Sequence, residues 1–486
     1  MYRFVIITLC VLLSNFMSLF SIKAIANDVK YKLIRQEKGM PFANQVKEDN
    51  TVYDIVNDID LGCDSIFLPK GCCLKFSGGK ISNGFLWGND TQIEAAKEII
   101  FDGSLTLCGN WKADIAYPEW FGAAGDGMND DLKAIQKSIS IFSAIEFNRY
   151  YKVSDKIVLD SYKTLVGSNN AVIEISDTER INYVLQTPHV GSYKEISIKG
   201  ITFIGHCSHE TYHETGLCAV ELVNVDAVDI GDCLFTGFNK NVEITKCTNV
   251  LIDNNSILDA TETSNKINGY GILIEGGDSI NIVNNRMYNI ERHGIYLNSP
   301  SNVLVSNNYI EGQTNNLERF SHWEGNIKVN GVRNVLIKDN VSIGNYYGIS
   351  IMSGFREKGF CGQNIKIENN IIKNCIRNPG FGFGAISFPE SGTLNNVTII
   401  NNIIENELEY NRCVYRGINI ENFSSSNIRY SFDNVMMSGN RIKGFPTKCR
   451  ISLSNQFKLN DNVISGKYEL SRDTDDNSCN FVINDF

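Results

Sequence analysis

The stretch NVLIDNNSI, residues 249–257, decides the fold, because variants of it recur to the end of the chain. The later copies are INIVNNRMY from Ile280, NVLVSNNYI from Asn302, NVLIKDNVSI from Asn334, NIKIENNII from Asn364, NVTIINNII from Asn396, NVMMSGNRI from Asn434 and FKLNDNVI from Phe457. They follow one another at intervals of 22 to 38 residues, about 30 on average. A repeat of this length is typical of a solenoid, in which each coil buries its apolar face against the next.

Each repeat contains two phrases that alternate apolar and polar residues. In the first, NVxI has the period of two that a strand requires, and the following Asn pair favours a sharp bend because Asn tolerates left-handed backbone. We expect these asparagines to stack into a hydrogen-bonded ladder inside the coil. The second phrases are GILIE (271–275), GIYLN (294–298), NIKVN (326–330), GISIM (348–352), AISFP (385–389) and GINIE (417–421).

With a short apolar strand between the two phrases, each coil has three strands joined by unequal loops. This predicts an all-β fold, a single-stranded parallel β-helix. Related phrases at 196–205 and 227–235 extend the pattern toward the N-terminus. A leucine-rich repeat is the main alternative, but the regular leucine spacing it needs is absent.

The N-terminal residues 1–26 are interpreted as a signal peptide. A basic start is followed by the apolar stretch Phe4–Phe20 and by the small-residue site Ala24-Ile25-Ala26. The expected protein is therefore secreted, periplasmic or on the cell surface of a bacterium, and free of the membrane after cleavage. An uncleaved membrane anchor is the alternative.

The rest of the chain is expected to form two parts. Residues 27–115 are predicted to be a β-rich N-terminal cap with the first coils, and residues 116–486 the β-helix proper. Between 129 and 142, Leu132, Ile135, Ile139 and Phe142 recur at helical spacing. This amphipathic helix is expected to cap the open end of the stack and to shield its apolar interior.

Charge and cysteine content limit the kinds of ligand that the chain is expected to bind. The net charge of −10 and the lack of a basic stripe argue against nucleic acid, although a local basic site could still bind an acidic polysaccharide. Thirteen of the 14 cysteines lie outside the signal segment, and none has zinc-finger spacing. Their pairing stays open. No metal ligands and no cofactor are assigned; calcium remains possible, and the oligomeric state stays open.

The segment PEWFGAAGDGMNDDLKAIQKSI, residues 118–139, contains the phrase GDGxxDDxxAIQ. It resembles the N-terminal motif of the pectate-lyase-like right-handed parallel β-helix superfamily, which includes secreted polysaccharide lyases, glycoside hydrolases and tailspike proteins. The resemblance implies a right-handed helix and a carbohydrate ligand, but it does not transfer a reaction. The full paired-aspartate motifs of polygalacturonases are absent. We interpret Asp126, Asp130 and Asp131 as turn and helix-cap residues rather than as an acid pair or calcium site.

Aligning the second phrases predicts which side chains leave the coil. The first outward column is Glu221, Glu243, Leu273, Tyr296, Lys328, Ser350, Ser387 and Asn419, and a parallel column is Thr245, Glu275, Asn298, Asn330, Met352 and Glu421. Over this sheet we expect a cleft that holds the sugar chain. Asn298 and Asn330 are predicted to bind substrate, together with Trp323, Tyr346 and Tyr347 as exposed rings in the adjoining loops.

The richest polar patch supports three hypotheses. For a lyase acting on a uronate, Lys328 would be the base, Arg292 would neutralise the carboxylate, and Tyr296 or His293 would be the acid. For a glycoside hydrolase, Glu221 with Glu243 would suit a retaining pair and Glu243 with Glu275 an inverting pair. A polar outer face that only binds glycan, or that is structural, is the third reading.

Overall fold

The computed structural model describes most of the chain after residue 29. The described residues are 30–36, 40–176, 182–208, 216–263, 268–312, 325–352, 361–376, 384–388, 393–409, 414, 416–420, 432–445, 447–453, 457–460, 463–464 and 469–472. The predicted signal peptide and Trp323 lie outside these ranges. The chain divides into two compact units, Met1–Asp114 with Glu119–Gly122, and Ile115–Pro118 with Ala123–Phe486.

The first unit is built on a parallel sheet of six strands, with β8 pairing to β7 beside the path β1-β2-β5-β7-β4. Its strands are β1 (Lys30–Ile34), β2 (Thr51–Ile55), β5 (Cys73–Phe76), β7 (Gly84–Ala95), β4 (Ser65–Phe67) and β8 (Leu105–Lys112). A second small sheet pairs β3 (Ile59–Asp60) with β6 (Ile81–Ser82), and the short helix is α2 (Phe42–Gln45). Tyr53, Ile55, Leu74 and Leu86 are fully buried and form the centre of this unit's core.

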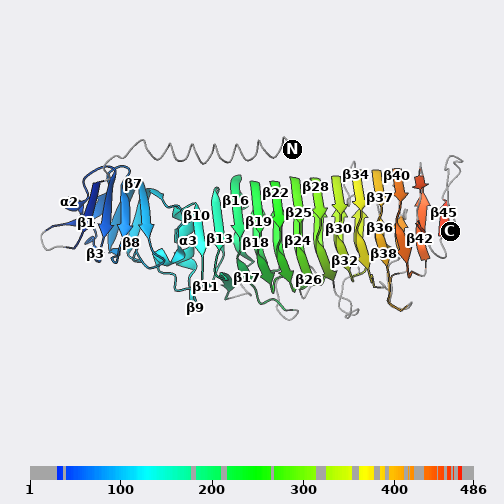
Figure 1. The fold of residues 1–486 in the computed structure, drawn as a ribbon, viewed down its shortest axis with the longest axis horizontal. Coiled ribbons are helices and arrows are strands. Elements are labelled where there is room, and N and C mark those ends of the chain that lie inside the picture. Colours follow the sequence, from blue (N-terminus) through cyan, green and yellow to red (C-terminus); the bar gives the residue numbers. More distant parts are fainter. Residues whose placement is uncertain are drawn as a thin grey trace, which may run out of the picture. The chain divides into compact units, whose positions relative to one another are not determined.

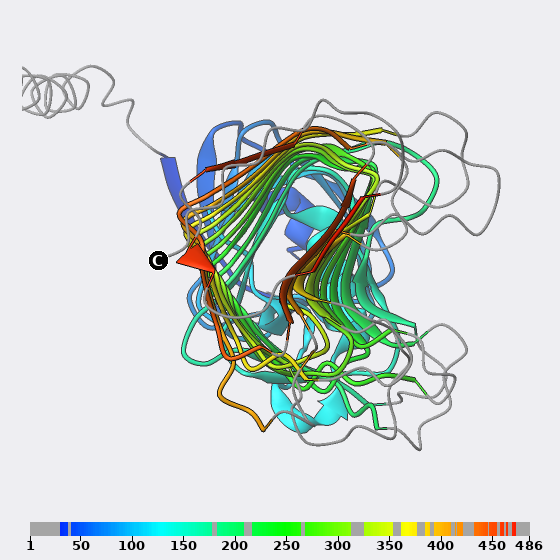
Figure 2. The same ribbon diagram turned by 90° about the vertical axis from the view of Figure 1, so that its right-hand side faces the viewer.

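The second unit is a parallel β-helix of three long sheets, which run side by side in Figure 1 and surround one interior in Figure 2. Sheet 1 contains β10 (Ala144–Phe147), β13 (Lys163–Gly167), β16 (Tyr193–Lys199), β19 (Val225–Gly231), β22 (Thr248–Asp253), β25 (Asp278–Val283), β28 (Ser301–Ser306), β31 (Arg333–Lys338), β34 (Cys361–Glu368), β37 (Thr393–Ile400), β40 (Phe432–Ser438) and β43 (Phe457–Asn460). Sheet 2 contains β9 (Asp126–Asp130), β11 (Tyr150–Val153), β14 (Val172–Ile175), β17 (Thr202–Ile204), β20 (Leu234–Thr236), β23 (Ser256–Leu258), β26 (Arg286–Ile290), β29 (Tyr309–Gly312), β32 (Val341–Ile343), β35 (Ile371–Lys373), β38 (Ile403–Glu405), β41 (Arg441–Lys443) and β44 (Val463–Ile464).

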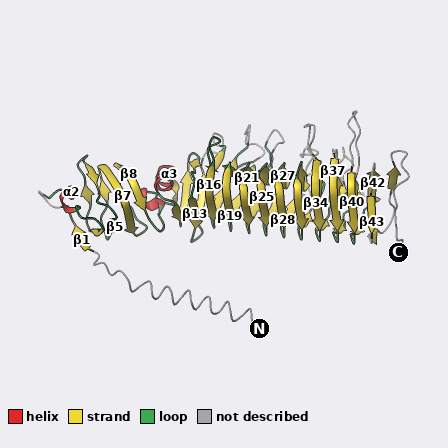
Figure 3. Cartoon of the chain, turned by 90° about the horizontal axis from the view of Figure 1, so that it is seen from above, coloured by secondary structure: helices red, strands yellow, loops and turns green. Residues whose placement is uncertain are grey.

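Sheet 3 carries the second phrase of each repeat. Its strands are β12 (Ile157–Val158), β15 (Tyr183–Gln186), β18 (Cys218–Val223), β21 (Lys240–Thr245), β24 (Tyr270–Glu275), β27 (His293–Asn298), β30 (Gly325–Asn330), β33 (Ile349–Met352), β36 (Gly384–Phe388), β39 (Arg416–Ile420), β42 (Thr447–Leu453) and β45 (Glu469–Arg472). The predicted all-β parallel solenoid is confirmed, and strands make up nearly all of its regular structure in Figure 3.

The two asparagines of each repeat have different structural roles. In the repeat at 249, Asn254 adopts a φ of 55°, and its counterpart Asn284 a φ of 58°, which bends the chain out of sheet 1. The second Asn points inward, where Asn255 Nδ2 donates to Asn285 Oδ1 over 2.9 Å. The same bond continues through Asn308, Asn340, Asn370, Asn402 and Asn440. The predicted internal ladder is therefore confirmed.

The predicted amphipathic helix is α3 (Leu132–Ile141), which buries Ala134, Ile135 and Ile139. The aspartates before it hold a turn, as expected. Asp131 accepts hydrogen bonds from the Ala124 and Gly125 N–H groups, and Asp126 from the Met128 and Asn129 N–H groups. Asp130 accepts from the Leu132 N–H at the start of the helix and from Ser154. These bonds use the carboxylate oxygens within the turn and at the start of the helix, so the motif has a structural role here.

Two further findings concern the described residues alone. None of their helices is long and apolar enough to cross a membrane. The cysteines at 63, 72, 73, 108, 207, 218, 233, 247 and 375 are free thiols, and Cys72, Cys218, Cys233, Cys247 and Cys375 among them are buried.

Candidate functional site on the outer face of sheet 3

The register of sheet 3 aligns the residues of the predicted outward column on successive strands. Glu221 pairs with Glu243, Glu243 with Leu273, Leu273 with Tyr296 and Tyr296 with Lys328. The column then continues through Ser350, Ser387 and Asn419. The parallel column from Thr245 through Glu275, Asn298 and Asn330 to Met352 also has the predicted register. The flanking Ile and Leu side chains, such as Ile295 and Leu297, are fully buried in the coil.

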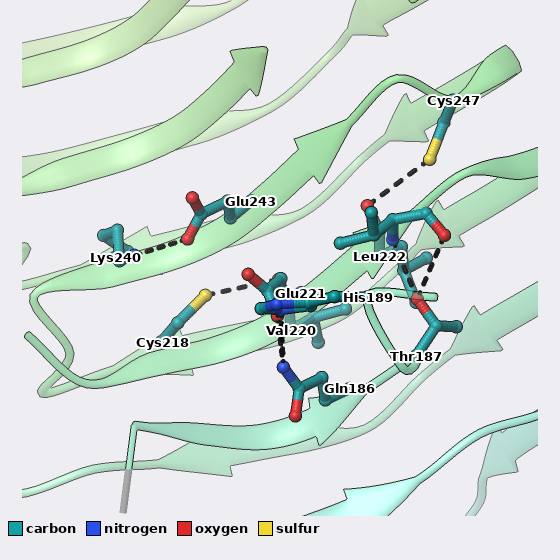
Figure 4. Close-up of polar contacts among 11 residues, drawn as sticks. Gln186, Thr187, His189, Cys218, Val220, Glu221, Leu222, Lys240, Glu243 and Cys247 are labelled. Atoms are coloured by element: carbon teal, nitrogen blue, oxygen red, sulfur yellow. Dashed lines mark hydrogen bonds and ion pairs between the residues drawn. The ribbon is translucent and has the colours of Figure 1, made fainter. Parts of the chain in front are cut away.

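Two carboxylates lie on neighbouring strands at one end of the column, and Figure 4 shows their surroundings. Glu221, on β18, accepts from Gln186 Nε2 at 2.6 Å and lies 2.8 Å from His189 Nε2. Glu243, on β21, forms an ion pair with Lys240, three residues earlier on the same strand. Strands of one sheet are spaced by roughly 4.8 Å, so the two Glu residues are direct neighbours.

Both carboxylates of this pair are buried, and the surroundings of Glu243 shift its pKa. Glu221 and Glu243 are only 5% and 8% exposed. Burial raises the pKa of Glu243, and the negative charges of Glu221 and Glu275 raise it further, against the lowering effect of Lys240. The ammonium of Lys240 loses hydration through burial, but the acidic groups around it raise its pKa overall, so it stays charged. Glu243 is thus the carboxyl more easily protonated than an ordinary glutamic acid.

Aromatic rings surround the centre of the predicted patch. Tyr270 and His293 stack with centroids 5.5 Å apart, and the Tyr296 ring lies 5.3 Å from the His293 ring. Two cations face these rings: Lys328 Nζ lies 5.3 Å from the centroid of Tyr296, and the Arg292 guanidinium lies 5.6 Å from that of Tyr270. A cation is attracted electrostatically to the face of an aromatic ring. Lys328 and Arg292 therefore place positive charge next to Tyr296 and Tyr270.

The titratable groups of this cluster differ in access to solvent. His293 is fully buried, and burial together with the nearby Lys328 and Arg292 charges keeps its pKa well below 6.5. Tyr296 is half-buried; burial raises its pKa, while the side-chain hydrogen bond to Asn330 lowers it. At neutral pH, His293 is therefore a neutral imidazole behind Tyr296, and Tyr296 is the group that a ligand can reach.

The structure brings most predicted site residues together on this face. Lys328, Tyr296 and His293 come from β30 and β27, and Arg292 directly precedes β27. Glu275 and Asn298 are half-buried in the second column, where Asn330 Nδ2 donates to Asn298 Oδ1 over 3.2 Å. Glu243 lies two strands before Tyr296 in the first column. Trp323, the remaining predicted contact, lies outside the described residues.

The expectation that Tyr346 and Tyr347 are exposed is wrong. They are 2% and 1% exposed, so neither ring can stack on a sugar. For Tyr347 the reason is the absence of a side chain at Gly325: a Cβ atom there would lie 1.8 Å from the Tyr347 ring, which fills this space. The Tyr347 ring instead extends the aromatic cluster, 6.4 Å from the ring of His293.

Sequence reasoning identified His293 but missed the equivalent residues at the start of the preceding sheet-3 strands. Lys240, Tyr270 and His293 occupy one register position, just before the alternating phrases that were aligned. Extending the alignment by one residue toward the N-terminus would have found Lys240 and Tyr270. Gln186 and His189 carried no such signal, because β15 lacks the repeated phrase.

Comparisons with known proteins agree with this geometry. The family model for the right handed beta helix region matches residues 191–313 and 240–429. Among the curated proteins, none matches this chain. The chain has the fold of the right-handed parallel β-helix proteins, as its three parallel sheets and this match show.

Three solved structures illustrate what shares this fold. The surface protein and adhesin PfbA of Streptococcus pneumoniae is 17% identical with a TM-score of 0.54, covering 76% of this chain and 99% of that one. The exopolygalacturonase of Thermotoga maritima is 13% identical with a TM-score of 0.51, covering 76% and 91%. The Dettilon tailspike protein is 14% identical with a TM-score of 0.52, covering 74% and 68%. At these identities the likeness shows the fold alone.

Proposed function

We propose that this chain is an exported enzyme that degrades an acidic polysaccharide held on the outer face of sheet 3, by β-elimination. The observation that carries the proposal is the pairing of Tyr296 with Lys328 on adjacent strands, with the ammonium 5.3 Å from the ring centroid. A solvent-accessible phenol, a cation one strand away and a second cation at Arg292 are the groups that elimination from a uronate uses.

The reaction assigns one role to each group. Arg292 pairs with the uronate carboxylate and stabilises the charge that develops there when the C5 proton leaves. Lys328 first gives up its own proton to solvent and then takes the C5 proton, and the C5–H electron pair becomes the C4=C5 double bond. The bond from C4 to the glycosidic oxygen then breaks, and Tyr296 protonates that oxygen. His293 touches Tyr296 from the buried side and orients it, which makes it a positioning residue.

Product chemistry tests this proposal. The purified chain is incubated with polygalacturonate, alginate and glycosaminoglycans, and the ultraviolet absorbance is followed. Elimination leaves a 4,5-unsaturated uronyl end, which absorbs in the ultraviolet. Tyr296→Phe should lower kcat by about 10²- to 10⁴-fold, the contribution of a positioned acid. Tyr288→Phe is the matched control, because Tyr288 lies on sheet 2 against Tyr309. Absorbance that rises equally in wild type and Tyr296→Phe would contradict the assignment.

Hydrolysis by Glu221 and Glu243 is the second candidate, favoured by the position of two buried carboxyls on neighbouring strands. The raised pKa of Glu243 suits a general acid, and Glu221, held by Gln186 and His189, would act as nucleophile or base. New reducing ends without ultraviolet absorbance, lost in Glu243→Gln and Glu221→Gln, would select this reaction. If neither product forms, the face is a glycan-binding surface without catalysis.

Export is part of the same proposal. The basic start and apolar stretch before Ala26 predict cleavage near Asn27. Mass spectrometry of the chain recovered from a bacterial host's culture medium or periplasm tests this, and a product that keeps Met1–Ala26 would contradict it.

A further inference from the structure

The first unit carries exposed aromatic side chains on one face of its sheet. Phe67 on β4 and Phe85 and Trp87 on β7, here called the aromatic platform, are 69%, 45% and 40% exposed. Phe67 pairs with Trp87 across the two strands, and their rings stack with centroids 5.4 Å apart and planes 17° apart. The platform is therefore a contiguous exposed apolar surface, in which Phe67 and Trp87 form a stacked pair anchored on neighbouring strands.

One face of this sheet is buried in the core of the unit, and the other face is exposed. Ile66, Leu86 and Leu105, which alternate with the outward residues, are buried in the unit's core. The outward neighbours in register with the platform are Ser65, Thr106 and Cys108, which are small and uncharged. Single exposed apolar residues need no explanation, but a contiguous exposed cluster rimmed by polar groups marks a binding surface.

We propose that the aromatic platform binds a neutral polysaccharide, independently of the face of sheet 3. The exposed parts of the Phe67, Phe85 and Trp87 rings offer apolar area to the C–H faces of pyranose rings, and the hydroxyls of Ser65 and Thr106 at the rim can bond sugar hydroxyls. No member of the platform or of its in-register rim carries a charge, which matches a neutral glycan rather than the acidic substrate proposed above.

The charge of the unit argues against a membrane as the occupant. Its described residues carry nine Lys and Arg against twelve Asp and Glu, a net charge of −3. An anionic lipid surface attracts basic segments and repels this one. The three side chains of the platform are also far fewer than the roughly 20–30 residues that each partner contributes to a stable protein–protein interface, so a glycan is the occupant that its chemistry fits.

Affinity electrophoresis of the full chain tests the proposal in gels containing hydroxyethyl cellulose, mixed-linkage β-glucan or soluble galactan. Wild type should be retarded in at least one gel, with about tenfold weaker affinity in Trp87→Ala and in Phe67→Ala. Trp87→Leu keeps apolar area but loses the flat ring, so it should be as weak as Trp87→Ala, whereas Trp87→Phe should keep most of the affinity. The matched control is Tyr162→Asn, which removes a 52% exposed ring from the second unit and should bind like wild type.

Three outcomes would overturn the proposal. The first is the absence of retardation in every gel, and the second is retardation that Trp87→Leu leaves at the wild-type value. The third is another occupant: dimerisation in sedimentation velocity, or co-sedimentation with phosphatidylcholine vesicles, that Trp87→Ala abolishes while glycan affinity is unchanged. Circular dichroism and thermal unfolding of each variant establish that it is folded. Elimination or hydrolysis on sheet 3 is measured separately, so failure of either proposal is visible on its own.

Discussion

Tyr270 and His293 occupy the same register position on neighbouring strands of sheet 3, and their rings stack with planes 11° apart. His293 Nδ1 lies 3.1 Å from the carbonyl oxygen of Gly325, on the next strand. The imidazole is therefore enclosed by a ring on one side and by backbone on the other. This enclosure, together with two nearby cations, makes the protonated form of His293 costly in the folded chain.

The first prediction concerns the stability of this stack against acid. The folded pKa of His293 is lowered, so above pH 6.5 the folded and unfolded chains both hold a neutral imidazole. As the pH falls below 6.5, only the unfolded chain gains the proton, and stability is lost by up to about 1.4 kcal/mol per pH unit. His293→Phe should remove this contribution, giving a shallower loss of unfolding free energy between pH 6.5 and 5 in urea titrations.

The matched control for this prediction is Tyr270→Phe, which keeps the stacked ring and adds no titratable group. Its pH dependence should follow that of wild type. Parallel pH dependences for wild type and His293→Phe would show that His293 does not carry the acid sensitivity.

The second prediction concerns the buried ion pair of Lys240 and Glu243, whose side chains are 8% and 11% exposed. Lys240→Met leaves a buried carboxyl without its cation, which should cost about 3–5 kcal/mol of unfolding free energy. Adding Glu243→Gln should restore most of the loss, because the remaining amide needs no counter-charge. The exposed pair of Lys112 and Asp90 is the control, and Lys112→Met should change stability by only about 0–1 kcal/mol. A double variant as unstable as Lys240→Met alone would refute the account.

The sequence predicted the coil and the outward column because both follow from strict periodicity. A strand has a period of two, and every repeat places an Asn at the same turn, so the register from Glu221 to Asn419 could be aligned by eye. The aspartates of 126–131 were also interpretable, since the spacing of acidic residues beside a helix start is local information.

Burial on the outer face could not be predicted in the same way. Whether Tyr347 is exposed depends on Gly325, which lies 22 residues earlier in the sequence and on another strand, and no local pattern reports that contact. The raised pKa of Glu243 is a similar case, because its environment is set by burial and by Lys240, Glu221 and Glu275 together. Charge environments of this kind arise from packing between coils, and sequence spacing alone does not encode them.

The third prediction concerns the internal Asn ladder. Asn340 Nδ2 donates to the Val305 carbonyl and to Asn370 Oδ1, and its own Oδ1 accepts from the N–H and side chain of Asn308. Asn340→Ala leaves several buried groups unbonded, so we expect a loss of about 2–4 kcal/mol in chemical denaturation. Asn334→Gly is the control, since Asn334 is exposed, has a φ of 55° that Gly tolerates, and makes surface bonds only, donating to Asn302 and accepting from Asn364 among the described contacts. It should cost less than about 1 kcal/mol, and equal losses at both positions would contradict an energetic role for the buried ladder.

The last prediction concerns the turn before α3. Asp131 is 3% exposed, and its two carboxylate oxygens accept from Ala124 N–H at 2.6 Å and Gly125 N–H at 3.1 Å. Asp131→Ala removes both acceptors and leaves two N–H groups without them, which should cost about 2–4 kcal/mol. Asp131→Asn keeps one acceptor oxygen and places an amide against the other N–H, so it should fall between wild type and Asp131→Ala. Asp155→Ala is the matched control, because Asp155 is exposed and bonds only the adjacent Lys156 N–H among the described contacts. If Asp131→Ala unfolds at the same urea concentration as Asp155→Ala, the aspartate does not hold this turn, and the GDGxxDD phrase needs another explanation, such as a ligand site.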